Sequence, residues 1–346
     1  MFSKKESTYI KGIALILMFT SHLFAFPEWL GAGNNFVSIP LYNNTIAYLI
    51  GKFGDVCIGI FMFLTGYGMY YSYQNGNAFL ISGRKVIKFL LKYWILLFTF
   101  FLPIQLMMGR TYFNPTKWHQ ELFGIYTSIV GFAWYVRFYV LTMLTLPALI
   151  NTIGNNVFIS AAFSIIPFQV IALLLRILST KITFHNTEAI TAEYFKYISV
   201  VLFGYCFAKF ELFDKLNTLL SKYRADSIFT YIIGIILIFV LRLKFYGETN
   251  IYLPNMDIIY VPILLFCTIK IIRNIKAELI LKCLGCIGKN SMNLWFLQSV
   301  FFFETNNLQW IIYLPRISFL VLICNIIILL PISELYNIIY KKLHIF

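Results

Sequence analysis

One of the four histidines, His22, lies inside a long apolar segment, KGIALILMFTSHLF. An imidazole has a pKa of about 6.5, so it takes up and releases a proton near neutral pH, as general base catalysis requires. A polar side chain within a membrane span is costly, and its presence therefore needs a specific explanation. We take His22 as the candidate catalytic residue. The alternative is a structural histidine, hydrogen-bonded between helices or located at the membrane interface.

Lys11 precedes His22 by eleven residues, a spacing that places both side chains on one face of a helix. Eleven steps of about 100° exceed three full turns by only about 20°. A rise of about 1.5 Å per residue separates the two residues by about 16 Å along the axis. This arrangement favours a long anionic molecule whose charged end binds Lys11 while its other end reaches the imidazole. The alternative is that Lys11 is an ordinary cationic anchor at the membrane surface.

Three further basic residues repeat at a helical spacing, because Arg84, Lys88 and Lys92 follow one another every four residues. Such a stripe attracts phosphate groups. It is also typical of the positive loops that orient a membrane protein and contact lipid headgroups. We take Arg84 and Lys88, together with Lys11, as candidate ligands of a phosphate-bearing molecule.

Asp55 and Gln298 are polar residues within apolar segments and are candidates for a supporting polar role. The six cysteines are scattered and include one CxxC pair, Cys283 and Cys286. No histidine and no second pair lies near it, and a structural zinc site needs four ligands. We therefore expect no metal site.

These residues must be positioned by membrane-spanning helices. Of the 346 residues, 60% are hydrophobic and 12% are charged, whereas soluble domains carry roughly 45–50% and about 25%. This composition excludes a water-soluble globular protein. We expect an all-α transmembrane bundle of about ten spans. Because ten spans of about 20 residues use most of the chain, we expect one integral-membrane domain over residues 1–346 with no separate soluble domain.

Ten apolar runs bounded by polar or Pro- and Gly-containing segments define the predicted spans. They are Tyr9 to Phe26, Leu49 to Tyr71, Val86 to Met108, Trp134 to Ile153, Val157 to Leu178, Tyr194 to Phe210, Ser227 to Phe245, Ile258 to Ile272, Ser291 to Phe303, and Ile317 to Ile338.

The loops between these spans divide the basic residues unequally. With a cytoplasmic N-terminus, 18 of the 28 lysines and arginines fall in inner loops and tails: Lys4, Lys5, Lys11, Arg84, Lys85, Lys88, Lys92, Lys209, Lys215, Lys222, Arg224, Lys270, Arg273, Lys276, Lys282, Lys289, Lys341 and Lys342. Six fall in outer loops: Arg110, Lys117, Lys181, Arg242, Lys244 and Arg316. Because basic residues gather on the cytoplasmic side, this asymmetry predicts that both termini are cytoplasmic and that the number of spans is even.

The net charge of +14 would suggest nucleic-acid binding in a soluble domain, but here we attribute it to membrane orientation and expect no nucleic-acid partner. The sequence has no P-loop, no dinucleotide-binding GxGxxG, no HExxH and no GxSxG. The longest outer loops are rich in Asn, Tyr, Trp and Gly. Such residues suit interfacial anchoring, and they also suit binding to a sugar.

Several segments together resemble the integral-membrane acyltransferases known as acyltransferase family 3. Lys11 and His22 match the family's opening helix, in which a basic residue precedes a histidine by the same spacing. FMFLTGYGMYYSY is similar to the family's FFFLSGY segment, with Thr65 in place of Ser. GRKVIKFLLKYW resembles a basic run that leads to a Tyr-Trp pair. AWYVRFYVLTMLTLP and LGCIGKNSMNLWFLQSVFF resemble later family segments in the same order.

Two positions depart from the pattern of the family. Many relatives carry an acidic residue where this chain has Gly59, and Asp55 lies one helical turn earlier. Many also carry a histidine where this chain has Gln298. A two-histidine mechanism is therefore not supported by this sequence.

The resemblance implies an O-acetyltransferase of a cell membrane, expected to be the bacterial cytoplasmic membrane. The donor would be cytoplasmic acetyl-CoA or another acyl-CoA, with no permanently bound cofactor, and the acceptor a hydroxyl of a surface polysaccharide or lipid-linked saccharide. His22 would be the general base, or would carry the acyl group transiently. Two alternatives remain open at this point: a transporter or flippase for a saccharide or lipid-linked oligosaccharide, and a glycan polymerase.

Overall fold

The computed structural model describes residues 3–31, 33–109, 117–181, 187–246, 255–302 and 308–345. The regular secondary structure of these residues is helical apart from two strands of two residues each, which confirms the predicted all-α class. Arg110, which the charge count places in an outer loop, and Phe303, the end of the predicted ninth span, lie outside the described residues.

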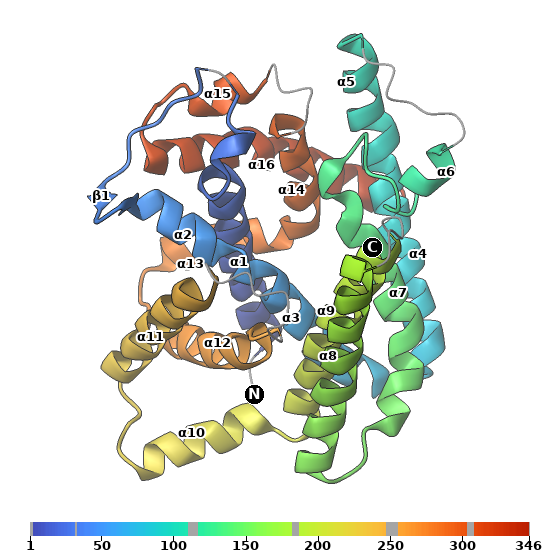
Figure 1. Ribbon diagram of the computed structural model, residues 1–346, viewed down its shortest axis with the longest axis vertical. Coiled ribbons are helices and arrows are strands. Elements are labelled where there is room, and N and C mark those ends of the chain that lie inside the picture. The colour runs from blue at the N-terminus through green and yellow to red at the C-terminus, as the bar shows by residue number, and fades with distance from the viewer. Residues whose placement is uncertain are drawn as a thin grey trace. The chain divides into compact units, whose positions relative to one another are not determined.

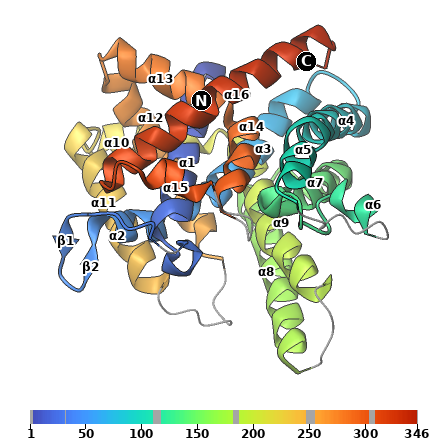
Figure 2. The ribbon, with the colours of Figure 1, turned by 90° about the horizontal axis from the view of Figure 1, so that it is seen from above.

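The α-helices are α1 (Lys4–Phe24), α2 (Ile46–Gly54), α3 (Val56–Tyr73), α4 (Ala78–Leu96), α5 (Leu102–Met107), α6 (Trp118–Glu121), α7 (Trp134–Leu149), α8 (Val157–Lys181), α9 (Thr187–Lys209), α10 (Leu212–Lys222), α11 (Ile228–Tyr246), α12 (Asp257–Asn274), α13 (Glu278–Lys289), α14 (Ser291–Leu297), α15 (Gln309–Tyr313) and α16 (Ser318–Lys342). Short 3-10 or π segments are η1 (Pro27–Trp29), η2 (Leu97–Phe101), η3 (Gly131–Ala133), η4 (Ile150–Thr152) and η5 (Gln298–Phe301). Strands β1 (Pro40–Leu41) and β2 (Asn44–Thr45) pair antiparallel, Pro40 with Thr45 and Leu41 with Asn44, ahead of α2 (Figure 2).

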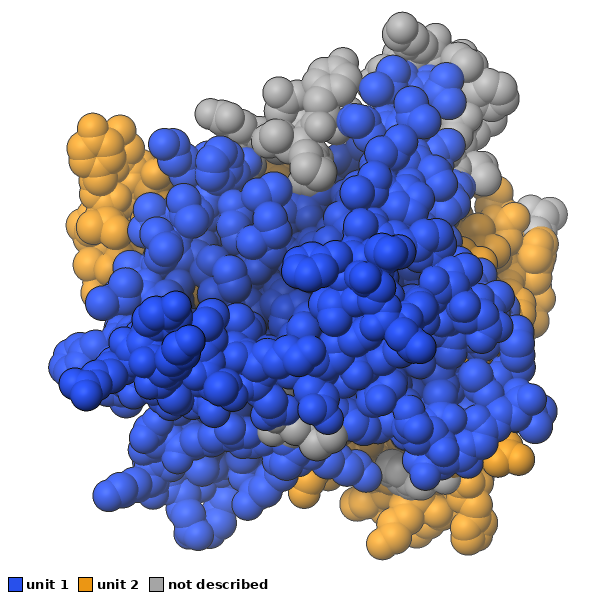
Figure 3. Space-filling view, turned by 90° about the horizontal axis from the view of Figure 1, so that it is seen from below, with its two compact units in different colours: residues 1–14, 56–81, 144–285 blue, residues 15–55, 82–143, 286–346 orange. Residues whose placement is uncertain are grey.

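The chain divides into two compact units, coloured blue and orange in Figure 3. Unit 1 contains residues 1–14, 56–81 and 144–285, and unit 2 contains residues 15–55, 82–143 and 286–346. Each unit is therefore assembled from three separate stretches of sequence.

In unit 1, α9 packs against both α8 and α3, and α8 and α9 run side by side (Figure 1). Glycines allow the close approach of α3 and α9, as is common between membrane helices. A Cβ at Gly66 would lie 1.7 Å from the carbonyl oxygen of Val201, and a Cβ at Gly204 would lie 2.3 Å from that of Phe63. The middle of α9 is consequently buried inside the unit.

Helix α1 begins with a capping box, a local signal of a helix N-terminus. The Ser3 N–H donates to Glu6 Oε2 at 2.6 Å, and the Glu6 N–H donates to Ser3 Oγ at 3.2 Å. The helix then continues without a break over Lys11 and His22. The predicted eleven-residue helical spacing between these two residues is therefore present in the structure.

Unit 2 contains the second half of α1 together with α2. Gly54 of α2 lies so close to α1 that a Cβ there would be 2.1 Å from the carbonyl oxygen of Leu17. A polar network joins α14 to α16, because Asn290 Oδ1 accepts hydrogen bonds from Ser333 Oγ at 2.5 Å and from Asn337 Nδ2 at 2.6 Å. These contacts fix the base of α14, the helix that leads to Gln298.

Seven helical segments in the described ranges are long and apolar enough to cross a membrane: Lys4–Phe24, Ile46–Tyr73, Ala78–Met107, Gly131–Thr152, Val157–Leu178, Ile228–Phe245 and Ser318–Lys342. They coincide with seven of the ten predicted spans. The other three predicted spans fall on α9, on α12 and on α14 with η5. Those segments are helical but more polar or shorter, and they do not meet the same criteria of length and composition.

Candidate functional site

The candidate site is built around His22, which lies in the last turn of α1 and belongs to unit 2. His22 Nδ1 and Gln298 Oε1 are 2.8 Å apart. Because an amide oxygen only accepts hydrogen bonds, Nδ1 carries the proton and donates it to this bond. The lone pair of the imidazole then lies on Nε2, the nitrogen that can accept a proton.

Aromatic side chains surround the imidazole. The Phe132 ring stacks on it with a centroid separation of 3.9 Å and an interplanar angle of 10°. Trp29 and Phe302 lie at 6.0 and 6.2 Å. The imidazole is half-buried, and these rings restrict the access of water to one of its faces.

Phe132 is held in place by hydrogen bonds from its own backbone to residues near Gln298. Trp295 Nε1 donates to the Phe132 carbonyl oxygen at 3.2 Å, and the Phe132 N–H donates to Ser299 Oγ at 3.3 Å. The ring that covers His22 and the amide that hydrogen-bonds it are therefore positioned by one helical segment, α14 with η5.

Gln309 of α15 fixes the segment that carries Trp29. Its Oε1 accepts hydrogen bonds from the Gly31 N–H at 2.7 Å and from Asn34 Nδ2 at 2.8 Å. Its Nε2 donates to the Trp29 carbonyl oxygen at 2.9 Å. Gln309 is fully buried and all its polar atoms are used, so it orders the chain beside His22.

A buried carboxyl, Glu121 of α6, orders the chain segment that precedes Phe132. Glu121 Oε1 accepts a hydrogen bond from the Ser128 N–H at 2.8 Å and another from Ser128 Oγ. Tyr93 of α4 donates its hydroxyl to the Glu121 carbonyl oxygen at 2.9 Å. Burial raises the pKa of Glu121, an effect that the hydrogen bonds from Ser128 oppose.

Of the two residues predicted to support His22, Gln298 is the one that contacts it. Asp55 is half-buried in the short break between α2 and α3. The imidazole donates its Nδ1 hydrogen bond to the Oε1 atom of Gln298. Gln298 is completely buried, and its Nε2 has no hydrogen-bond partner among the described residues.

The three predicted phosphate ligands fall in different units. Arg84 and Lys88 are exposed on α4 in unit 2, the unit that also contains His22. Helix α4 contacts α14 through Phe89 and Tyr93, whose rings lie 6.2 and 5.2 Å from that of Phe296, two residues before Gln298. Lys11 is half-buried on α1 in unit 1.

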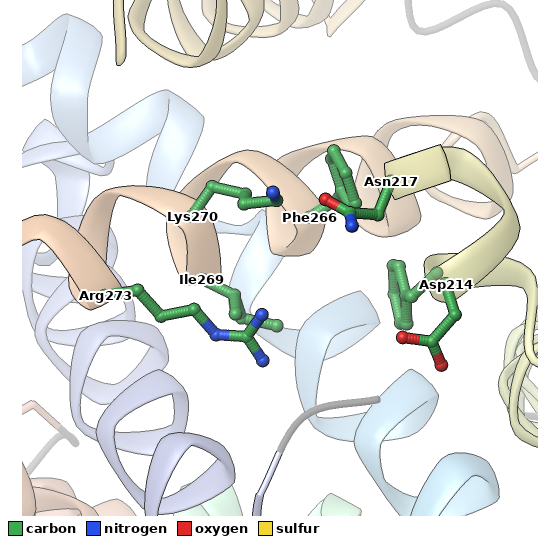
Figure 4. Close-up of a pocket in the computed structure, with 7 residues that line it drawn as sticks. Asp214, Asn217, Phe266, Ile269, Lys270 and Arg273 are labelled. Atoms are coloured by element: carbon green, nitrogen blue, oxygen red, sulfur yellow. The ribbon is translucent and has the colours of Figure 1, made fainter. Parts of the chain in front are cut away.

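Unit 1 contains a small, partly open hollow between α10 and α12. Asp214 and Asn217 extend into it from α10, and Lys270 and Arg273 from α12 (Figure 4). Both cations are already paired with carboxylates, since Lys270 Nζ lies 3.2 Å from Asp226 and Arg273 Nε lies 2.7 Å from Glu6. From the sequence, Lys270 and Arg273 were predicted only to be basic residues of an inner loop.

The CxxC cysteines belong to different units, and the Cys286 thiol donates to Glu334 Oε1 at 3.7 Å. Among the described residues, no group of three or more His, Cys, Asp and Glu side chains is arranged to hold a metal ion.

Comparison of the chain with protein-family models, with curated proteins and with solved structures found no match.

Sequence reasoning missed Phe132, Trp29, Ser299 and Gln309. None of them carries a local signal, because aromatic residues are abundant throughout the chain and Ser and Gln occur in many other positions. Only the fold brings Phe132 and Trp29 beside His22. It also places Ser299 and Gln309 against the backbone of these two aromatic residues. Chemically, the assembled site offers a proton acceptor of defined tautomer, a buried amide donor and an aromatic wall.

Proposed function

We propose that the protein is a membrane-embedded O-acyltransferase related to acyltransferase family 3. It would move an acetyl or other acyl group from cytoplasmic acyl-CoA to a hydroxyl of a surface polysaccharide or a lipid-linked saccharide. The observation that carries the proposal is the hydrogen bond between His22 Nδ1 and Gln298, which leaves Nε2 as a base beside an aromatic wall. General bases of this kind serve acyl transfer in many unrelated enzymes.

In the proposed reaction, His22 Nε2 accepts the proton of the acceptor hydroxyl. The hydroxyl oxygen attacks the thioester carbonyl carbon, and the carbonyl π electrons move onto its oxygen. The tetrahedral species collapses, the carbon–sulfur bond breaks, and the thiolate takes the proton from the imidazolium. The products are an acyl ester and CoA, so atoms and charge balance. Lys11, Arg84 and Lys88 would neutralise the phosphates of CoA.

The proposed function comes with a specific membrane topology, which is more detailed than the seven apolar helices alone. We propose one integral-membrane domain with about ten spans and both termini in the cytoplasm, in a bacterial cytoplasmic membrane. The 18 basic residues assigned to inner loops and tails support this orientation.

The test is acyl transfer by the purified protein with labelled acetyl-CoA and the saccharide fraction of its own membrane. We expect acceptor-dependent release of CoA, and a loss of at least about 100-fold in the His22→Ala variant, since a general base contributes typically 10²–10⁴-fold. The matched control is His119→Ala, because His119 is an exposed histidine on α6 and its loss should leave the rate unchanged.

NMR of surface glycans from cells that carry either variant would identify the acceptor hydroxyl. Normal O-acetylation with normally expressed His22→Ala protein would refute the proposed mechanism. Movement of saccharide across vesicles without release of CoA would instead identify a transporter.

A further inference from the structure

The strongest unexplained feature of the site is the amide nitrogen of Gln298. The side chain is completely buried, its Oε1 is hydrogen-bonded to His22, and its Nε2 has no partner in the part of the chain that the structure describes. Leaving a buried donor unpaired costs about 1–3 kcal/mol. Buried polar groups are usually paired, so an unpaired donor beside a candidate base suggests a group that bonds to a ligand.

The position of this nitrogen is fixed by its neighbours. A carboxamide is planar, and its oxygen is held by the imidazole, so Nε2 cannot turn away without breaking the bond to His22. The nearby donors have other partners, because Trp295 Nε1 and the Phe132 N–H are used to hold Phe132. Gln298 Nε2 therefore remains as a preoriented donor next to the proton acceptor.

We propose that Gln298 Nε2 donates a hydrogen bond to the carbonyl oxygen of the acyl thioester and stabilises the negative charge that develops there. This inference rests on the proposed function. In the transfer step written above, the carbonyl oxygen gains the π electrons when the hydroxyl oxygen attacks. A donor preoriented toward this oxygen lowers the barrier, and removal of one such donor costs about 10²–10³ in turnover. Gln298 would thus have two roles, through Oε1 on the base and through Nε2 on the substrate.

The substitution Gln298→Glu separates these roles. The glutamate keeps an oxygen that accepts the hydrogen bond from His22 Nδ1, but it replaces the donor with an acceptor. If Gln298 stabilises the oxyanion, turnover falls at least about 100-fold while binding of acetyl-CoA changes little. If Gln298 only orients the imidazole, Gln298→Glu stays within about threefold of the wild-type rate and its pH profile shifts to higher pH, because a carboxylate stabilises the imidazolium.

The control for burying a carboxylate is Asn325→Asp. Asn325 of α16 is also a completely buried amide in unit 2 with no partner among the described residues. Thermal unfolding of both variants reports how much the buried charge lowers the stability of the protein. Both variants should lose stability, and only Gln298→Glu should lose more turnover than that loss of stability explains. A rate of Gln298→Glu near that of the wild-type protein would overturn the inference.

A second measurement does not require the glutamate variant to fold. Gln298→Met is compared in the His22→Ala background, where no imidazole remains to be oriented. A direct contact with the substrate predicts that the residual transfer falls by a further tenfold or more, and an unchanged residual rate would show that Gln298 acts through His22 alone. If His22→Ala itself retains the full rate, the proposed function fails. A His22-dependent rate that Gln298 variants do not alter rejects only this inference.

Discussion

At the scale of single residues, Glu121 gives the structure a specific dependence on pH. The side chain is buried, and one carboxyl oxygen, Oε2, has no partner among the described residues. Burial raises its pKa above the ordinary value of 4.5. The folded state therefore binds this proton more tightly than the unfolded state, and the resulting stabilisation is complete below about pH 4.5 and lost as pH rises through the folded-state pKa.

We expect Glu121→Gln to remove this loss. The carboxamide oxygen still accepts the hydrogen bonds from Ser128, and no charge has to be buried at neutral pH. Between about pH 5 and pH 8, the melting temperature of the variant should rise relative to wild type by on the order of a few degrees. Glu278→Gln, a change at an exposed carboxylate, should show no such divergence. If the melting temperatures of wild type and Glu121→Gln change with pH in parallel, Glu121 does not have the predicted effect on stability.

Chemistry at single residues was predictable from the sequence only where a polar group stands in an apolar run. His22 and Gln298 were both selected in this way, but their contact joins residues 276 positions apart and follows from the fold. Phe132 could not be selected from 36 phenylalanines, because lipid, interface and core accept the same side chain. Asp55 was selected by its position along the chain, it lies in the short break between α2 and α3, and its supporting role stays a prediction.

At the scale of helices, the contact between α3 and α9 depends on Gly66. The carbonyl oxygen of Val201 occupies the space that a Cβ would need, so Gly66→Ala must push the two helices apart. We expect a loss of about 1–3 kcal/mol in stability, as for other overpacked cores, measured by unfolding in detergent.

Gly68, two residues further along α3, is the matched control. It is exposed, and no atom lies within 4 Å of the position that a Cβ would take there. Gly68→Ala should be neutral or stabilising by up to about 1 kcal/mol, since alanine is the better helix former. Equal effects of the two substitutions would show that helix propensity, and not the contact with Val201, governs this site.

Hydropathy located seven segments that are long and apolar enough to cross a membrane, and it was less informative for α9 and α12. Helix α9 carries Glu193 and Lys196, yet its central residues are buried against α3 and α8. Helix α12 begins at Asp257, which pairs with Arg242 at 3.0 Å, and its last turns carry Lys270 and Arg273. In a membrane protein, polar side chains are tolerated where a helix faces other helices, and charges at helix ends can be paired.

At the scale of the whole molecule, the count of spans decides where the C-terminus lies. Seven spans would place the two termini on opposite sides of the membrane, whereas ten would place them on the same side. The excess of basic residues in the predicted inner loops and tails favours the second arrangement, because cytoplasmic loops are enriched in lysine and arginine. It requires that α9, α12 and α14 with η5 cross the membrane although they fall below the hydropathy criterion.

Fusions of a fluorescent protein that matures only in the cytoplasm, or of a phosphatase active only outside, distinguish the two arrangements. We expect fluorescence from fusions at either terminus and from one placed after Ser227, which follows α10. With seven spans, the Ser227 and C-terminal fusions would instead give phosphatase activity. A fusion at Asn155, between α7 and α8, is the control, because both arrangements place this turn inside. Phosphatase activity at the C-terminus with a fluorescent N-terminus would reject the even count of spans.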